Sequence, residues 1–389
     1  MLRAVGWALG GALALIGFYA GFFTLYQPRD PDGDRAPPRT LSRSPTLPGQ
    51  ASLLFAGDTM LGYDALPTLE ERGFLYAFGS TLDLVRAADL AVVNAEAPIT
   101  DGGTRFPVWK EWSYRAPAAS VAALAEAGFD VVALANNHAT DYGPDGLADT
   151  IANLVRAGLV PYGAGRDSAE ARRGVIADVG GIRIGLLAYC ERQLLWNVWV
   201  DQYARPHHPG VAGAAEPDLG RDIARLRAAG AELIVVSLHI GDNYEPPTAS
   251  ALAWSRHAVD AGADLVVNHH PHVAHPILRW KGKPVLLSIG NYAFGTRARA
   301  ELDYGLLALA RARRCPGGGA AFERVEIVPL AVQNERVRYR PERLVGSELQ
   351  TELTHLAQIS RPYGAELTLA DDRAVLALDG CAGGSGAAP

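Results

Sequence analysis

The chain has 389 residues, of which 49% are hydrophobic, and its 36 basic and 42 acidic residues give a formal net charge of −6. It is long enough to bury one large core or two modest ones, and it shows no basic stripe that would indicate a nucleic-acid partner. Its three cysteines, Cys190, Cys315 and Cys381, form no CxxC pair, so disulfides are not expected to hold the fold. A pair between Cys315 and Cys381 stays open.

The N-terminal segment is apolar. Residues 4–26 include no charged side chain and are long enough to cross a hydrocarbon core of about 30 Å as a helix. Aromatic residues gather at the far end of this segment, as they do at a membrane interface, which favours an anchor over a cleaved signal peptide. The sequence therefore predicts one N-terminal transmembrane helix within residues 1–26.

Composition divides the rest of the chain into three parts. Residues 27–50 are rich in Pro, Arg, Asp and Ser, which is typical of a disordered linker. Residues 379–389 are rich in Gly and Ala and predict a disordered tail. Residues 51–378 are predicted to form one body, and we find no internal repeat in it.

The body alternates short apolar runs, typical of strands, with helix-like stretches. Several runs are apolar throughout, as in strands covered on both faces, and the helix-like stretches begin near Pro or end at Ala-Gly. The expected strands are 52–57, 90–94, 130–135, 182–189, 232–238, 263–268 and 284–290, and the expected helices are 117–128, 144–158, 216–230 and 248–262. This order predicts an α/β fold, and hairpin-like stretches at 306–314, 322–332 and 336–344 predict that the later sheet is mixed.

Polar side chains follow most of the expected strands, at the ends where open α/β sheets bind ligands. They are Asp58, Glu96, Asn136, Asn137, His138, His239, the histidines of 268–276 and Asn291. Each one alone could be a turn, cap or core residue. Turns do not select metal-binding side chains at nearly every strand end, so together these residues indicate a site.

Four of the 10 histidines, His269, His270, His272 and His275, lie in the stretch NHHPHVAHP at 268–276. Pro271 favours an extended backbone at His270, which would turn His270 and His272 to one side and His269 to the other. His270 and His272 then form a two-ligand unit, and His269 is structural or supports a ligand. The direction of His275 is left open.

The predicted donors are carboxylate, amide and imidazole groups, without a thiolate. Such donors suit Zn, Mn or Fe and argue against Cu(I). Their number predicts one or two divalent ions. Two ions about 4 Å apart or less would activate water and stabilise a tetrahedral or phosphoryl-like transition state.

Ordered motifs between residues 53 and 294 resemble those of the CapA family, the poly-γ-glutamate capsule synthesis proteins of the calcineurin-like metallophosphatase superfamily. The motifs are FAGDTMLG, NAEAPIT, YRAP, LANNHATDYG, VSLHIGDNYE, NHHPHVAHPI and SIGNYAFG. The resemblance implies a metallophosphatase-like four-layer α/β/β/α sandwich with mixed sheets and a di-metal cleft.

The resemblance also implies a role for each residue of the site. By analogy, Asp58 and His272 would hold one ion, Asn137, His239 and His270 the other, and Glu96 would be the bridging carboxylate. His138 would be a proton donor, or a cation that stabilises developing negative charge, and Asp141 would orient it.

The chain departs from the wider superfamily at the first metal. That superfamily begins with Asp-x-His, whereas this chain reads Asp58-Thr59-Met60, so metal binding is better supported than hydrolysis. CapA-like proteins generally share this absence. A smaller departure is Tyr63, which stands where a basic residue is common in the family.

Two loops rich in aromatic residues, at 105–117 and 191–210, carry the remaining candidates. Their aromatic side chains, among them Trp196 and Trp199, either pack under the loops or form a rim that engages an anionic polymer. Arg115 is the candidate to pair with a carboxylate of such a polymer, and Asn291 is the second candidate substrate-binding residue.

These observations support three hypotheses. The first is a membrane-anchored, metal-dependent member of the capsule synthesis machinery, beside other capsule synthesis membrane proteins. It would act on, or bind, a poly-γ-glutamate-like anionic polymer, and its site is of the hydrolase type. The second is a subunit that binds or assembles the polymer without catalysis, and the third is a general metallophosphoesterase. A histidine in the position of His138 that is not itself a ligand favours catalysis.

Two arguments about topology conflict. Arg3 precedes the predicted anchor and Arg29, Arg35, Arg39 and Arg43 follow it, and this count would keep the body in the cytoplasm. The family resemblance implies a cytoplasmic N-terminus and a body outside. We follow the resemblance, because a long folded domain translocates largely regardless of nearby charge. The expected location is the cell membrane, with a single pass and an extracytoplasmic body.

Overall fold

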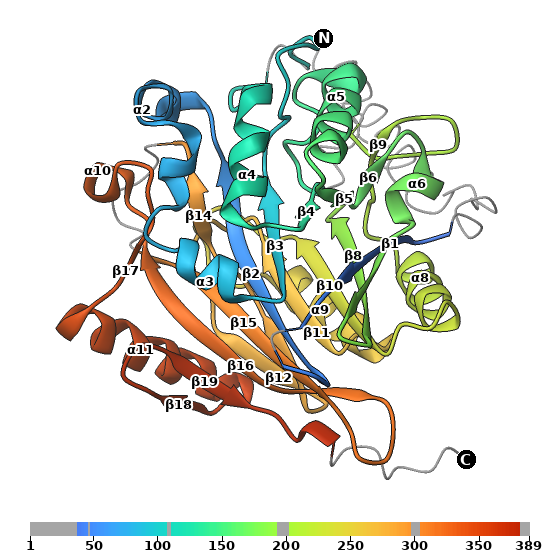
Figure 1. The fold of residues 1–389 in the computed structure, drawn as a ribbon, viewed down its shortest axis with the longest axis vertical. Coiled ribbons are helices and arrows are strands. Elements are labelled where there is room, and N and C mark those ends of the chain that lie inside the picture. Colours follow the sequence, from blue (N-terminus) through green and yellow to red (C-terminus); the bar gives the residue numbers. More distant parts are fainter. Residues whose placement is uncertain (1–36, 46, 107–109, 193–201, 297–303, 382–389) are drawn as a thin grey trace, which may run out of the picture.

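The computed structural model describes residues 37–45, 47–106, 110–192, 202–296 and 304–381. The predicted membrane anchor lies outside these ranges. Within them, no helix is both long enough and apolar enough to cross a membrane. The described residues form two large mixed sheets with helices on their outer sides (Figure 1).

The first sheet has seven strands. In spatial order they are β1 (Arg39–Arg43), β7 (Val175–Val179), β8 (Ile182–Cys190), β10 (Leu233–His239), β11 (Leu265–His269), β13 (Lys283–Leu286) and β12 (Ile277–Trp280). β8, β10, β11 and β13 run parallel, whereas β7 and β12 are antiparallel to their neighbours β8 and β13. The parallel strands at the centre place their carboxyl ends at one edge.

The second sheet has ten strands. Its main order is β18 (Leu367–Leu369), β19 (Ala374–Ala377), β16 (Ala320–Ala331), β15 (Tyr304–Arg314), β2 (Gln50–Met60), β3 (Leu90–Ala95), β4 (Val131–Ala133) and β5 (Val160–Tyr162), with β14 (Asn291–Phe294) on β2 and β17 (Glu342–Arg343) on β16. A separate pair consists of β6 (Ala164–Gly165) and β9 (Gly210–Val211). β2 to β5 are parallel and β15, β16, β18 and β19 antiparallel, which confirms the predicted mixture.

The described residues form the four predicted helices and five α-helices that were not predicted. They are α2 (Leu66–Arg72), α3 (Leu82–Ala87), α4 (Val121–Ala127), α5 (Gly143–Arg156), α6 (Ser168–Arg172), α8 (Glu216–Ala228), α9 (Ala249–Asp260), α10 (Asn334–Val337) and α11 (Gly346–Ser360). Proline occupies the first turn of α5 and α8, and the Thr248 side chain caps α9 by accepting a hydrogen bond from the Ala251 amide. The predicted hairpin strand at 336–344 is confirmed only in part, because the stretch begins with the end of α10 and only β17 within it pairs antiparallel with β16.

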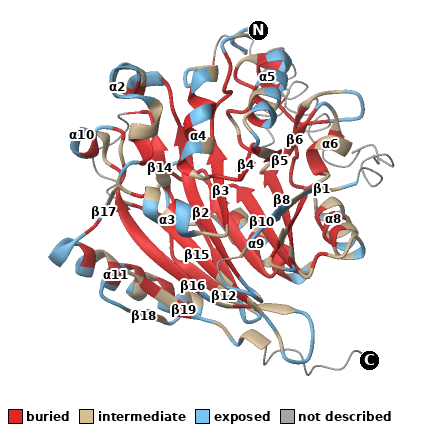
Figure 2. Ribbon diagram, in the orientation of Figure 1, coloured by how far each residue is buried: buried red, intermediate tan, exposed pale blue. Residues whose placement is uncertain are grey.

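Strand β10 shows how the layers are built. Leu233 and Val235 join the core between the two sheets, whereas Ile234, Val236 and Leu238 face the second core, under α8 and α9. Because side chains alternate along a strand, one apolar run covers both faces. The central strands of both sheets are mostly buried in Figure 2, and α3 and α4 lie over the other sheet. Helices therefore cover both outer sides of the paired sheets.

The ordered body is longer at both ends than the predicted range of 51–378. Residues 39–43 of the predicted linker form β1, which pairs in parallel with β7, and Arg39 contacts Glu170. At the other end, Asp379 of the predicted tail pairs with Arg279, their Nη2 and Oδ2 atoms 2.7 Å apart. A strand pairing and ion pairs thus attach both predicted disordered segments to the body.

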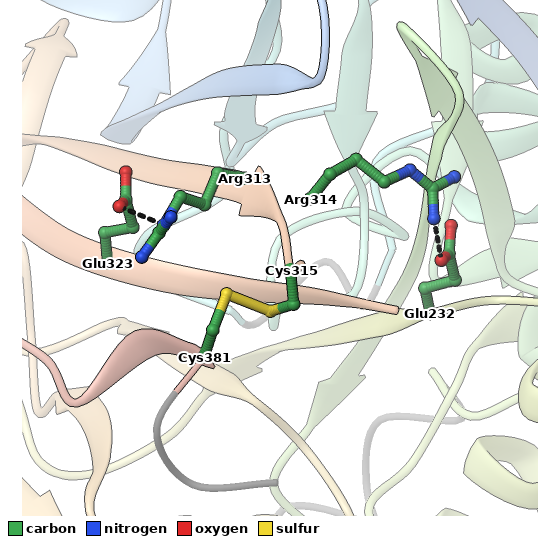
Figure 3. The surroundings of a disulfide bond; sticks show 6 residues. All are labelled: Glu232, Arg313, Arg314, Cys315, Glu323 and Cys381. Carbon is green, nitrogen blue, oxygen red and sulfur yellow. Dashed lines mark hydrogen bonds and ion pairs between the residues drawn. A yellow bond between two sulfur atoms is a disulfide. The ribbon is translucent and has the colours of Figure 1, made fainter. Parts of the chain in front are cut away.

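A disulfide joins Cys315 to Cys381 (Figure 3). Cys315 follows β15 at the turn toward β16, and Cys381 follows β19, so the bond closes a loop with a sequence separation of 66. Arg314 beside it pairs with Glu232 across the two sheets, at 2.5 Å. The expectation that disulfides do not hold the fold was therefore wrong for the C-terminal segment, and Cys190 is buried and free.

Reduction of this disulfide is expected to lower the free energy of unfolding, by at most about 4 kcal/mol from loop entropy alone. Urea unfolding of the oxidised and reduced protein measures the difference as a shift of the midpoint. The Cys315→Ser variant should match the reduced wild type and should not respond to reductant. Identical midpoints for oxidised and reduced wild type would contradict a stabilising role.

Candidate metal centre

Six predicted donor residues converge at the carboxyl ends of the parallel strands. Asp58 lies near the end of β2, Glu96 follows β3, Asn137 follows β4, and His239 ends β10, while His270 and His272 follow β11. These strands belong to both sheets, so the site lies where the ends of the two sheets meet. The convergence expected from the strand-end pattern is present, and the role of each residue stays a prediction.

The side chains form two groups that could each hold a metal ion. One consists of Glu96, His239 and His270 and the other of Asp58, Glu96 and His272, and within each group the donor atoms lie within 4.8 Å of one another. Glu96 Oε1 lies 3.3 Å from His239 Nε2 and 3.8 Å from His272 Nε2. The carboxylate of Glu96 is thus shared, as a bridging ligand would be.

The surroundings of the Glu96 carboxylate show whether the donor residues fit a metal ion. Its side chain is fully buried, yet neither carboxylate oxygen has a hydrogen-bond partner among the described residues. Burial raises the pKa of Glu96 well above its usual range, and the nearby charge of Asp58 raises it further. A buried carboxylate without hydrogen bonds is costly unless a cation neutralises it, so the donor set fits a divalent ion.

The two histidines of the first group are suited to metal binding because they are held neutral. His239 Nε2 lies 3.1 Å from His270 Nδ1 and 2.8 Å from the side-chain oxygen of Asn137. Burial, followed by the charge of the neighbouring histidine, lowers the pKa of His270 to about 3 and that of His239 well below its ordinary value. Neutral imidazole is the form that binds a metal, and Asn137 completes the group with an oxygen.

Asp58 is positioned by a close approach of two backbones. A Cβ atom on Gly57 would lie 2.1 Å from the carbonyl oxygen of Gly290, so only glycine fits there. The pairing of β2 with β3 shifts register between Ala56 and Asp58, and this bulge directs the Asp58 carboxylate into the site. Asn94, which the sequence analysis did not single out, donates to Asp58 Oδ1 at 2.7 Å.

The predicted geometry of the histidine loop was wrong. His270 has a φ of 99° and His272 a φ of 60°, so neither has extended backbone, although both side chains reach the site. The turn is held from outside, because the His270 amide donates to Asp58 Oδ2 and the Tyr244 amide donates to the Pro271 carbonyl. These hydrogen bonds outweigh the preference for extended backbone at a residue before proline. Strained backbone of this kind is found mostly at functional sites.

The other two histidines of the loop also have defined places. The sequence predicted that His269 turns away from the site. It does not, and its Nδ1 lies 3.2 Å from Asp58 Oδ1. Burial raises the pKa of Asp58, but hydrogen bonds to His269 and His272 outweigh this and hold it well below its usual range. The Nε2 atom of His275 lies 2.9 Å from the carbonyl oxygen of Glu245, and His275 belongs to neither donor group.

His138 belongs to a separate buried group. Its Nδ1 lies 2.7 Å from Asp141 Oδ2, which is the contact that the predicted orienting role of Asp141 requires. Its backbone amide donates to Asn136, which in turn donates to the Ala95 carbonyl. Burial, followed by the charge of Lys110, lowers the pKa of His138 to about 4. Lys110 lies in the aromatic-rich loop 105–117, and nothing in the sequence pattern connects it with His138.

The buried Tyr114, which lies against His138, and the exposed Tyr63 and Trp112 form a group that we call the aromatic rim. The side chains of Tyr63 and Trp112 are 42% and 48% exposed, and their ring centroids lie 6.4 Å apart. Tyr114 lies between Tyr63 and His138, with ring centroids 5.4 and 4.2 Å away. Trp112 of the loop at 105–117 is thus accessible and Tyr114 is buried, whereas Trp196 and Trp199 of the other loop lie outside the described residues.

The two predicted substrate-binding residues occupy different environments. Arg115 is exposed, and its guanidinium lies 4.5 Å from the centroid of the Tyr142 ring, next to the aromatic rim in sequence. The side-chain oxygen of Asn291 lies 2.8 Å from His272 Nδ1, so Asn291 orients a predicted ligand. Arg115 remains a candidate for contact with substrate.

Comparisons with known proteins agree on one family. Residues 52–296 match the sequence profile of the bacterial capsule synthesis protein family PGA_cap. The chain is 30% identical to the PGA biosynthesis protein CapA of Bacillus subtilis, over 66% of this chain and 67% of that protein. It is also 30% identical to the capsule biosynthesis protein CapA of Bacillus anthracis, over 72% of this chain and 67% of that protein.

Two further comparisons found a relative with a shorter match and a solved structure. A probable polyglutamine synthesis accessory protein of Mycobacterium tuberculosis is 35% identical over 53% of this chain and 55% of its own length. The solved structure of the calcineurin-like phosphoesterase YfkN from Bacillus subtilis aligns with a TM-score of 0.45 and 15% identity, over 71% of this chain and 90% of that one. A likeness of that size carries no argument about activity.

Proposed function

Because the chain belongs to the bacterial capsule synthesis protein family PGA_cap, as its motifs predicted, we propose that it is a membrane-anchored protein of poly-γ-glutamate biosynthesis or processing, with a metal-dependent hydrolase site that cleaves such a polymer. The single observation that carries the catalytic part is the pair of buried donor groups that share Glu96. A site built only to bind a polymer does not need a bridging carboxylate or a buried His–Asp pair beside it.

Different residues of the site have different roles in the proposed reaction. Divalent ions held by the two donor groups would supply a water molecule with lowered pKa and stabilise negative charge in the transition state. The residues that would hold the ions are Asp58, Glu96, Asn137, His239, His270 and His272. In the proposed reaction Nε2 of His138 takes a proton from the attacking water and gives it to the leaving group, because Asp141 engages Nδ1.

The aromatic rim and Arg115 suit an anionic chain with an apolar backbone. A γ-linked glutamate unit offers two methylenes, an amide and a carboxylate. The exposed faces of Tyr63 and Trp112 contact the methylenes, and Arg115 pairs with the carboxylate. This arrangement gives the polymer a path that ends at His138, next to Tyr114.

A hydrolysis screen of the metal-loaded, full-length protein tests the proposal. The substrates are γ-glutamyl peptides, poly-γ-glutamate and simple phosphoesters, each with Mn, Zn or Fe. Cleavage of γ-glutamyl bonds that chelators abolish supports the proposal. Cleavage confined to phosphoesters would replace it with a general metallophosphoesterase.

One observation favours a second candidate, a subunit that binds or assembles the polymer without catalysis. Met60 stands in the position of a missing metal-binding histidine and is buried against Ala97, Tyr114 and Phe294. The Asp58 group therefore has fewer donors, and its ion would be held more weakly. Binding of polyglutamate that is not followed by cleavage with any metal would support this candidate over the hydrolase.

The Cys315–Cys381 disulfide supports a body outside the cytoplasm, since structural disulfides persist mainly in oxidising compartments. We expect protease added to intact spheroplasts to digest the body while a cytoplasmic marker survives. Partners in this setting would be other capsule synthesis membrane proteins. Protection of the body until the cells are lysed would reverse the topology and remove the cell-surface role.

A further inference from the structure

Lys110 is a buried cation beside the site. Its side chain is 3% exposed, although it comes from a loop whose neighbouring residues Glu111 and Trp112 are exposed. Arginine supplies nearly all of the 36 basic residues of the chain, and Lys110, Lys281 and Lys283 are its only lysines. Burying an ammonium group is costly unless it is paired, so its partners indicate its purpose.

The ammonium group holds two parts of the site together. Lys110 Nζ donates to the Asn137 carbonyl at 2.8 Å and forms an ion pair with Asp141 Oδ1. Asp141 Oδ2 accepts from the Tyr114 amide at 2.7 Å and lies 2.7 Å from His138 Nδ1. Lys110 therefore fixes the carboxylate that faces His138, and also the backbone that leads into His138.

The contacts of His138 Nδ1 decide which tautomer this arrangement selects. Nδ1 lies 3.2 Å from Lys110 Nζ and 2.7 Å from the Asp141 carboxylate. A carboxylate only accepts, so the shorter contact requires a proton on Nδ1, and the ammonium donates its protons to Asp141 and Asn137 instead. Nε2 is then the nitrogen that is left to exchange a proton with a reactant.

We propose that Lys110 is a positioning residue that fixes the Asp141 carboxylate in place, and thereby holds His138 as the tautomer protonated at Nδ1. A lysine suits the task because its ammonium is a compact point charge, whereas the planar fork of arginine needs more room. The role rests on the proposed use of His138 in catalysis, but the tautomer itself is a property of the protein without metal or substrate.

The test is nitrogen NMR of the full-length protein with ¹⁵N-labelled histidine, prepared free of metal. The His138 signals are identified by their loss in His138→Gln. In the wild type, Nδ1 of His138 should carry the proton and Nε2 should not. In Lys110→Met this single-tautomer signature should be lost, because Asp141 no longer has its counter-charge.

Lys281→Met is the matched control, since Lys281 is an exposed lysine paired with Asp260, and it should leave the His138 signals unchanged. If Lys110→Met does not fold, Lys110→Gln keeps neutral donors at a similar length and should also lose the single tautomer. An unchanged His138 tautomer in a folded Lys110 variant would overturn the proposal.

Where hydrolysis is found, Lys110→Met should lower kcat about 10–100-fold and leave KM nearly unchanged. A failed hydrolysis screen leaves the NMR result intact, so the two proposals fail separately.

Discussion

Alanine in place of His239 or His270 is expected to remove most of the divalent metal that the full-length protein binds. Each histidine is one of the few donors that surround Glu96, and His239 also contacts Asn137. Loss of one imidazole leaves the Glu96 group with too few ligands to compete with water. Metal analysis after equilibration with Mn, Zn or Fe and gel filtration measures the effect.

Two other buried histidines provide matched controls for this experiment. His275→Ala should keep its metal, because His275 lies against the Glu245 carbonyl and not in either donor group. His269→Ala should keep metal at saturating concentration, since His269 contacts Asp58 and is not predicted to contact an ion. Metal contents equal to wild type in both His239→Ala and His270→Ala would show that the donor assignment is wrong.

His138→Ala is expected to lower the rate of hydrolysis by about 10²–10⁴-fold, the usual contribution of a positioned proton donor. Metal content and thermal stability should stay close to wild type, because His138 is in neither donor group. Steady-state kinetics on the cleaved substrate, together with metal analysis of the same sample, provide the measurement.

The control for this variant is His257→Ala, which changes a histidine near the end of α9. It should retain wild-type kinetics. A fall in the metal content of His138→Ala would mean that His138 is a ligand and that its assigned role is wrong. Wild-type rates in His138→Ala would mean that the reaction does not use this proton donor.

The site was predictable from the sequence where local patterns determine it. Apolar runs mark parallel strands, and the residues that follow them must meet at one edge of a sheet, which is why the strand-end pattern alone groups Asp58, Glu96 and His239. The residues that support the predicted ligands and His138 follow no such pattern. Asn94 and Lys110 act through side chains whose reach depends on how distant segments pack.

Elements held by long-range contacts were the ones that the sequence did not reveal. β1 is five residues of mixed polarity (RTLSR) on the edge of a sheet, without the apolar run that marks a buried strand. The turn at His270 has its conformation imposed by Asp58, which is 212 positions away in the chain. Cysteine spacing alone does not give connectivity, so the Cys315–Cys381 pair could only be left open.

Because Glu96 belongs to both donor groups, the two groups form one thermodynamic unit. An ion in the first group would change the charge that Glu96 and the nearby Asp58 present to an ion in the second, and by linkage the reverse would hold with equal free energy. Occupancy is then a function of free metal concentration and not a fixed stoichiometry. A preparation with one ion per chain and another with two can be the same protein at different points on one coupled binding curve.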